Sequence, residues 1–251
     1  MTFWNFAKNK KNEEEIDLRI DGDIVADGDT WFYDWFGEPS TSPNKFRKAL
    51  AEYKGKSINV WIDSYGGDVL AAAGIYNALK EHKGKVRVKI DGKAMSAGSI
   101  IAMAGDEILM SPLSIMMIHN PWSGASGEAK DFIHQAKVLG EVKETLLNAY
   151  QSKTGIDRNK ISEMMDNETW MSAKTAVAEG FADGILYEDE EEEKKTNNFM
   201  YSRFAVQNNT SKNMERFFEL YNEKFKKEDT GETLVDLYSK QNKIIERMKQ
   251  L

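Results

Sequence analysis

Three kinds of side chain used in acyl transfer follow one another along this sequence. Ser96 lies where a strand pattern gives way to a short apolar helix. His119 ends an apolar run, and two carboxylates, Asp166 and Glu168, follow further along the chain. A serine hydroxyl can attack a carbonyl when a histidine takes its proton and a carboxylate orients that histidine. These residues indicate nucleophilic catalysis by serine, and the alternative is a serine that merely caps its helix.

Backbone N–H groups near Ser96 could hold the oxyanion that such an attack creates. Ala97 begins the predicted helix, where the first N–H groups have no partner within the helix. Gly67 is the second candidate, in a Gly66-Gly67 pair between a strand pattern and a helix pattern. Paired glycines permit positive φ and close approach of a ligand, although a tight turn without function is the alternative. Neither GxGxxG nor GxxxxGK[ST] is present, so nucleotide binding is not indicated.

Alternating apolar and polar residues predict strands over 16–20, 57–63 and 86–90. The last two each lead into a turn of small residues and then a helix. In a right-handed, mainly parallel sheet, successive turns of this kind lie at the same edge. Two short strands are predicted at 107–110 and 114–119, and the second leaves His119 at its end. We therefore expect the two turns to face each other at one edge of a sheet.

Amphipathic patterns predict the helices. We expect one helix after Ser42, a long helix over about 127–153 capped by Ser126 and ended by Gly155, a short helix over 156–165, and a helix from Ser172 to Ala178. The apolar stripe of the long helix indicates burial against a neighbour, either within the chain or in another subunit. The aromatic segment 31–36 is interpreted as core cover, with a substrate-facing or subunit-facing loop as the alternative.

The composition limits the class of protein. With 251 residues, of which 41% are hydrophobic, the chain can form one large domain and a smaller appendage. The absence of cysteine excludes disulfides and thiolate zinc sites, and three histidines argue against a histidine-rich metal site. A net charge of −7 argues against a broad nucleic-acid surface. We expect no metal, no cofactor, no nucleic-acid partner and no membrane segment, and a cytoplasmic location.

A change of composition after Leu186 predicts the domain organisation. The acidic run 188–193 and the polar residues after it are typical of a solvated linker. Two amphipathic helical patterns follow, and they indicate either a hairpin docked on the body or a tail for partner binding or oligomerisation. We expect an N-terminal segment at 1–15, a main domain at 16–187, a linker at 188–210 and a helical C-terminal extension at 211–251.

Four ordered segments resemble the Clp peptidase (ClpP) family, over about residues 16–187. They are IDSYGG at 62–67, GKAMSAG at 92–98, MIHNP at 117–121, and WMSA through EGFAD at 170–183. The resemblance implies an α/β fold, the spiral of ββα units shared with crotonases, in which the long predicted helix is a protruding handle through which rings associate. It also implies a peptidase domain over 16–187, followed by the helical extension.

The resemblance assigns a role to each candidate site residue. It implies that Ser96 is the nucleophile, that His119 is the general base, and that the amides of Gly67 and Ala97 bind the oxyanion. Glu168 aligns with the aspartate of the family and is favoured as the third member of the triad. Asp166, two residues earlier, is the alternative.

Within the family, the chain resembles the phage-encoded branch associated with capsid maturation. The grounds are the short start at 3–6, Asp68 after the paired glycines, and the charged C-terminal extension. This resemblance implies a serine endopeptidase that processes capsid or scaffold precursors in the host cytoplasm. It implies homo-oligomeric rings that admit extended polypeptide. The alternatives are a degradative peptidase partnered by an ATP-driven unfoldase, a crotonase-like acyl-thioester enzyme, and a non-catalytic assembly scaffold.

Overall fold

The computed structural model of the chain describes residues 7–8 and 16–187. The chain divides into two compact units, Met1–Asn198 and Phe199–Leu251, and every described residue belongs to the first. The predicted linker at 188–210 and helical extension at 211–251 therefore lie outside the described residues. So does the predicted N-terminal segment at 1–15, apart from residues 7–8.

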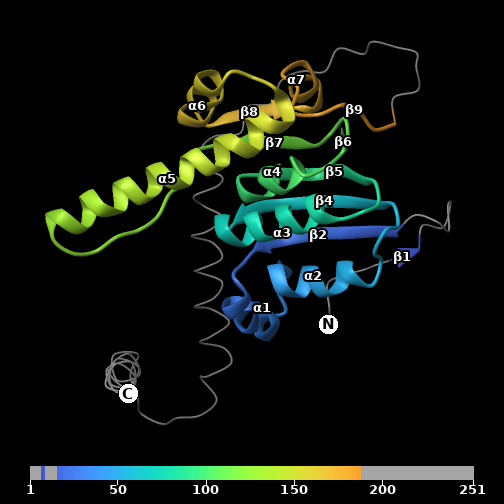
Figure 1. Cartoon of the computed structure of the whole chain (residues 1–251), viewed down its shortest axis with the longest axis horizontal. Helices are drawn as coiled ribbons and strands as arrows, with labels where there is room; N and C mark the ends of the chain where they lie inside the picture. The colour runs from blue at the N-terminus through green and yellow to red at the C-terminus, as the bar shows by residue number, and fades with distance from the viewer. Residues whose placement is uncertain (1–6, 9–15, 188–251) are drawn as a thin grey trace, which may run out of the picture. The chain divides into compact units, whose positions relative to one another are not determined.

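A mostly parallel sheet forms the centre of this unit (Figure 1). Its strands are β1 (Ala7–Lys8), β2 (Ile16–Ile24), β3 (Ser40–Thr41), β4 (Ile58–Gly67), β5 (Val86–Met95), β6 (Glu107–Met110), β7 (Ile115–Ile118), β8 (Thr169–Ser172) and β9 (Gly184–Ile185). The main path runs β1-β2-β4-β5-β6-β9, with β3 beside β2 and β7 between β5 and β8. Only the β1–β2 and β7–β8 pairs are antiparallel among the described strands. The predicted α/β class is confirmed.

Helices pack on this sheet and enclose the core. They are α1 (Thr30–Phe36), α2 (Pro43–Ala51), α3 (Val69–Glu81), α4 (Ala97–Ala102), α5 (Ala129–Thr154), α6 (Arg158–Asp166) and α7 (Ala173–Ala178), with a 3-10 turn at Asp27–Asp29. Figure 1 shows α2, α3 and α4 on the same face of β2, β4 and β5. Alternate residues of these strands, such as Leu18, Val60 and Val88, are fully buried. Burial of these apolar side chains is the main favourable contribution to folding.

The central strands extend further than their side-chain pattern predicts. β4 continues through Gly67 and β5 through Met95, so the paired glycines are the last residues of β4, and Ser96 directly follows β5. Because both glycines have positive φ, this end of β4 is called the glycine turn. Backbone pairing causes the extension, because Ser64 pairs with Ala94 after a register shift and Gly67 pairs with Ile24. Main-chain hydrogen bonding thus continues where polar residues and glycines have ended the alternation.

The long helix α5 begins two residues later than predicted. Ser126 is not its cap, because a capping box between Glu128 and Asp131 closes the amino end. Gly155 ends the helix in the left-handed conformation, as predicted. Only the carboxyl-terminal part is buried, through Leu146, Leu147 and Tyr150, and the amino-terminal half runs past the edge of the sheet (Figure 1).

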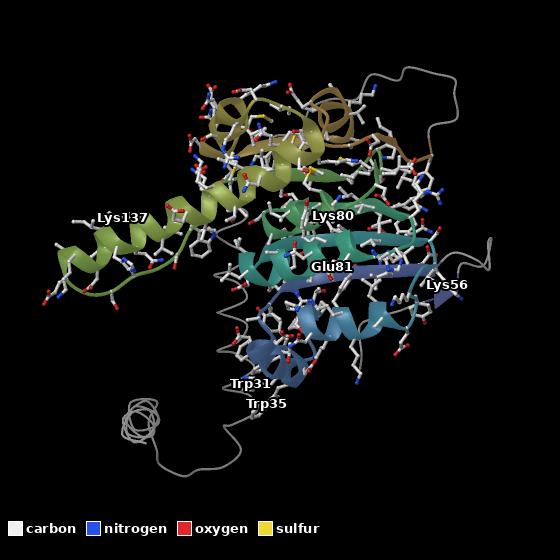
Figure 2. The ribbon with its side chains drawn as sticks, viewed as in Figure 1. Trp31, Trp35, Lys56, Lys80, Glu81 and Lys137 are labelled. Atoms are coloured by element: carbon white, nitrogen blue, oxygen red, sulfur yellow. The ribbon has the colours of Figure 1, made fainter. Side chains whose placement is uncertain are left out.

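The aromatic segment forms α1, in which Phe32, Tyr33 and Phe36 are half-buried and the two tryptophans are exposed, so the prediction of core cover is wrong for the tryptophans. Trp31 and Trp35 are 61% and 52% exposed, and both lie on α1 (Figure 2). They are one helical turn apart, which puts them on the same face, and their rings contact each other with centroids 6.4 Å apart. Aromatic composition alone does not distinguish a packed ring from an exposed one.

Candidate active site

Ser96 occupies a strained main-chain position between β5 and α4. Its φ is 51° and its ψ is −120°, a conformation that is unfavourable for a residue with a side chain. The Ser96 N–H donates to the Met117 carbonyl at 2.9 Å, which ties the turn to β7. Its hydroxyl makes no capping hydrogen bond, so the interpretation of Ser96 as merely a cap is wrong. A sharp strand-to-helix turn of this kind holds a serine hydroxyl clear of the backbone.

His119 reaches this hydroxyl from the adjacent strand. Its Nε2 lies 2.7 Å from Ser96 Oγ, which is hydrogen-bond distance. The contact follows from strand pairing, because Met95 pairs with Met117 and each functional residue comes shortly after its strand. The structure therefore brings together two side chains that are 23 positions apart in the sequence.

Glu168 and His119 adjoin the same end of two paired strands. β7 and β8 are antiparallel, and their last pair is Ile118 with Thr169, so His119 directly follows β7 and Glu168 directly precedes β8 at this end. Burial lowers the pKa of His119, and the negative charge of Glu168 opposes this effect, so the carboxylate lies in the electrostatic environment of the imidazole. Glu168 also has a positive φ of 49°, and its Oε1 accepts a hydrogen bond of 3.3 Å from Trp170 Nε1.

Asp166, the alternative carboxylate, has different partners. Its Oδ1 accepts from Asn120 Nδ2 at 2.7 Å and from Lys143 Nζ at 2.6 Å. The hydrogen bond from Asn120, followed by that from Lys143, lowers the pKa of Asp166. Asp166 thus ties α5 to the loop that follows His119, and the pKa of His119 carries no contribution from it.

Burial makes His119 suited to accept a proton at neutral pH. Desolvation lowers its pKa below the ordinary 6.5, and the negative charge of Glu168 opposes this effect more weakly. A histidine with a lowered pKa is neutral at pH 7, and only the neutral imidazole can take the proton of a serine hydroxyl. The pair therefore has the protonation state that general-base catalysis requires.

The paired glycines pack directly against the serine turn. Gly66 and Gly67 have φ values of 106° and 142°. A Cβ built on Gly66 would lie 2.7 Å from the Met95 carbonyl oxygen and 2.8 Å from Ser96 Cβ. A Cβ on Gly67 would lie 2.1 Å from the Ile24 carbonyl oxygen. Only glycine permits this approach, which brings the backbone of β4 beside Ser96.

Ser64 supports the glycine turn, a role that its sequence pattern did not predict. Its buried hydroxyl donates to the Gly22 carbonyl at 2.6 Å and accepts from the Gly66 N–H at 3.1 Å. These bonds join β2 to the turn of β4 and fix the direction of the Gly66 peptide. The position of a serine in a predicted strand, two residues before paired glycines, could have indicated this supporting role.

Of the predicted site residues, the structure brings Ser96, His119 and the Gly66-Gly67 turn into one cluster, and Ala97 follows Ser96 directly. Glu168 lies on the His119 side, and Asp166 belongs to a separate ion pair. Within the described part of the chain, no group of three or more metal-ligating side chains could hold a metal ion. In the same residues, no helix has the length and apolar character needed to cross a membrane.

Comparison with known proteins gives the family. The Clp protease family model matches residues 48–189, more than half of the chain. The chain belongs to the Clp protease family. This is a family of serine peptidases, and the Ser96 and His119 pair lies within the matched region.

Individual Clp relatives cover the same part of the chain. An ATP-dependent Clp protease proteolytic subunit of Borreliella afzelii is 31% identical over 138 residues, which are 54% of this chain and 70% of the relative. Proteolytic subunit 1 of Borreliella burgdorferi is 30% identical over 138 residues, 54% of this chain and 71% of the relative. Proteolytic subunit 1 of Salinibacter ruber is 30% identical over 140 residues, 55% of this chain and 60% of the relative.

Replacement of Gly67 by alanine tests the close approach at the glycine turn. We expect Gly67→Ala to lower the melting temperature by several degrees, because the new Cβ would meet the Ile24 carbonyl and the φ of 142° is unfavourable for alanine. Gly28→Ala is the matched control, since a Cβ there would meet nothing within 4 Å. Equal melting temperatures of the two variants in a thermal scan would contradict the described geometry.

The environment of His119 predicts the pH dependence of Ser96 reactivity. The rate at which a fluorophosphonate labels Ser96 should reach half its maximum below pH 6.5, because the neutral imidazole is the reactive form and burial lowers its pKa. In Glu168→Gln the midpoint should move lower still, because the charge that raises the His119 pKa is removed. A midpoint above 6.5, or an upward shift in the variant, would contradict this assignment.

Proposed function

We propose that this chain is a serine endopeptidase that cleaves peptide bonds through an acyl-enzyme. The observation that carries the proposal is the 2.7 Å contact between His119 Nε2 and the hydroxyl of Ser96, which lies on a strained turn. Membership of the Clp protease family supports the same reaction class. Ser96 is the nucleophile, and His119 is the general base.

The reaction begins when Ser96 Oγ attacks the carbonyl carbon of the scissile peptide and its proton passes to His119 Nε2. The carbonyl oxygen becomes an oxyanion, which accepts hydrogen bonds from the amides of Gly67 and Ala97. The C–N bond then breaks, and His119 gives its proton to the leaving amine. Water attacks the resulting ester in the same way, which releases the acid and regenerates the serine.

Glu168 is the third member of the proposed triad. Its position directly before Thr169, which pairs with Ile118, supports this role, and its charge would stabilise the imidazolium that forms during each step. The glutamate side chain is one methylene longer than the aspartate of the family, which extends its reach toward the imidazole. Asp166 is occupied by Asn120 and Lys143 and takes a structural role.

The substrate is an extended polypeptide that adds as a strand beside the glycine turn, with its scissile carbonyl over Ser96. Copies of the chain form homo-oligomeric rings through the projecting half of α5. Exposed apolar side chains on this half, Phe132, Ile133 and Val138, support the proposal, because exposed apolar residues on a projecting arm favour contact with a neighbour. A closed ring would exclude folded proteins.

The proposed domain organisation places this activity in residues 16–187. Residues 1–15 precede the peptidase domain, 188–210 form a linker, and 211–251 form a helical extension. The boundaries follow from the acidic run after Leu186 and the amphipathic patterns beyond it.

The proposed biological role is the processing of phage capsid or scaffold precursors during head assembly. Residues 3–6, Asp68 and the C-terminal extension support this role by resemblance. Asp68 is weaker support for this role than the other two features, because its carboxylate accepts from the Ala71 N–H at 2.6 Å and so caps α3. Helix capping alone explains an aspartate at this position.

A second candidate is a degradative peptidase that receives extended chains from an ATP-driven unfoldase. It is favoured by the relatives, which are named ATP-dependent Clp protease proteolytic subunits. Co-expression with a capsid precursor distinguishes the two roles. Shortening of the precursor by the wild-type chain supports capsid processing, whereas an intact precursor together with cleavage of small peptides supports the degradative role.

Substitution of Ser96 tests the peptidase proposal. Ser96→Ala should lower kcat for a fluorogenic peptide by about 10⁴-fold or more without loss of folding, because the nucleophile is removed from a turn that alanine strains no more than serine does. Ser57→Ala, at the opposite end of β4, is the control and should retain activity. Mass spectrometry of the fluorophosphonate adduct should locate it on Ser96. Labelling at another residue, or cleavage of the peptide by Ser96→Ala, would overturn the proposal. Labelling of Ser96 would argue against the two alternatives, a crotonase-like enzyme and a non-catalytic scaffold.

Substitution on the projecting half of α5 tests ring formation. Ile133 is 60% exposed, and Ile133→Glu should shift the protein to smaller species in analytical ultracentrifugation, because it introduces a charge into an apolar contact. Lys80→Glu on α3 makes a larger change of charge elsewhere and is the control (Figure 2). An unchanged assembly in Ile133→Glu would place the ring contact on another surface.

A further inference from the structure

A buried pair of hydroxyl groups lies directly behind the serine turn. Ser99 on α4 is 0% exposed, and Tyr150 on α5 is 1% exposed. Their oxygens are 2.8 Å apart. The Tyr150 ring packs against Phe181 with centroids 5.8 Å apart, which fixes the position of the phenol. Neither hydroxyl has a part in the proposed reaction steps.

The directions of the hydrogen bonds follow from proton counting. Ser99 Oγ lies 2.6 Å from the carbonyl oxygen of Ser96, and a carbonyl can only accept. The single proton of Ser99 is therefore donated to Ser96. The phenol of Tyr150 must then donate its proton to Ser99 Oγ, and burial raises the pKa of Tyr150, which keeps this proton in place. The result is a chain of bonds from Tyr150 through Ser99 to the Ser96 carbonyl.

This carbonyl belongs to the same peptide group as the N–H of Ala97. A peptide group is planar and trans, so the carbonyl oxygen and the N–H point in opposite directions within one rigid plane. The Ser96 oxygen also accepts from the Ser99 and Ile100 N–H groups at 3.0 and 3.3 Å. Donors that hold this oxygen therefore set the direction of the Ala97 N–H, and the additional hydroxyl bond polarises the peptide and strengthens that N–H as a donor.

We infer that Ser99 and Tyr150 are positioning residues that orient and strengthen the Ala97 N–H as an oxyanion donor. The inference rests on the proposed peptidase function, because it assigns these hydroxyls to the transition state of that reaction. The Ser96 peptide requires such contacts because its main chain is strained: a φ of 51° is unfavourable unless neighbouring groups hold it. Tyr150 acts through Ser99 and touches neither substrate nor the reacting atoms.

Kinetics of the full chain test the inference. Tyr150→Phe should lower kcat about threefold and Ser99→Ala about tenfold, with KM nearly unchanged, because a neutral hydrogen bond has an effect of this size and the oxyanion exists only in the transition state. Affinity for a peptide aldehyde, which forms a tetrahedral adduct on Ser96, should fall by the same factors. Tyr76→Phe on α3 makes the same chemical change and should leave both quantities unchanged.

The double variant Ser99→Ala/Tyr150→Phe makes the test independent of folding defects. It leaves no buried hydroxyl without a partner, so it should fold even if a single variant does not. Because Tyr150 acts through Ser99, the double variant should have the kcat of Ser99→Ala alone. An unchanged kcat, or a loss expressed equally in KM, would overturn the inference and leave a purely structural pair.

Wild-type activity separates failure of this inference from failure of the proposed function. If the wild-type chain neither cleaves a peptide nor reacts with a fluorophosphonate at Ser96, the proposed function is wrong and the positioning role is wrong with it. If the wild type is active and the folded double variant is equally active, only the positioning role is wrong.

Discussion

The contact between Ser96 and His119 depends on one constraint in the sheet, which is that β5 changes its neighbour along its length. Up to Ile90 the strand pairs with β6, and from Lys93 to Met95 it pairs with β7. β7, which ends directly before His119, therefore lies beside the last residues before Ser96. Because β7 also pairs with β8, Thr169 lies opposite Ile118, and Glu168 and His119 adjoin this end of the two strands. The positions of Ser96, His119 and Glu168 thus depend on where β5 and β7 end and where β8 begins.

The unfavourable main-chain conformation of Ser96 is held by buried residues on either side of it. A positive φ in a residue with a side chain costs about 1–3 kcal/mol. The neighbours Met95 and Ala97 are buried in the apolar interior, so relaxation of the turn would expose them. Packing free energy thus maintains a turn that local preference would not form. Burial of the His119 ring lowers its pKa, so packing contributes to the protonation state of the site as well as to its geometry.

Helix α5 connects the projecting arm of the molecule with the site at two points. Tyr150 bonds the α4 serine behind the Ser96 peptide, and Lys143 pairs with Asp166, which also holds the side chain next to His119. The part of α5 that makes these contacts is continuous with the exposed part that carries Ile133. Position and orientation of α5 therefore affect both the nucleophile side and the base side of the site.

The sequence by itself determined the elements whose signals are local. Alternation predicted β5 from Val86 to Ile90, although the strand continues to Met95. Ser172 and Gly155 were predicted at the ends of their helices, and the small residues around Ser96 predicted a strand-to-helix turn. Each of these depends on backbone preferences within a few residues. The order of the motifs gave the family and the candidate site residues, whose catalytic roles stay predictions.

Only the tertiary structure decided the features that depend on residues distant in sequence. It showed that Asp166 is bonded to Asn120 and Lys143, that Trp31 and Trp35 of α1 are exposed to solvent, and that Tyr150 bonds Ser99 across 51 positions. The composition of a segment does not determine which of its side chains become buried, and the alternation of side chains does not determine where strand pairing ends. Register and burial arise when separate segments pack together, which is the physical reason that they could not be predicted from the local sequence.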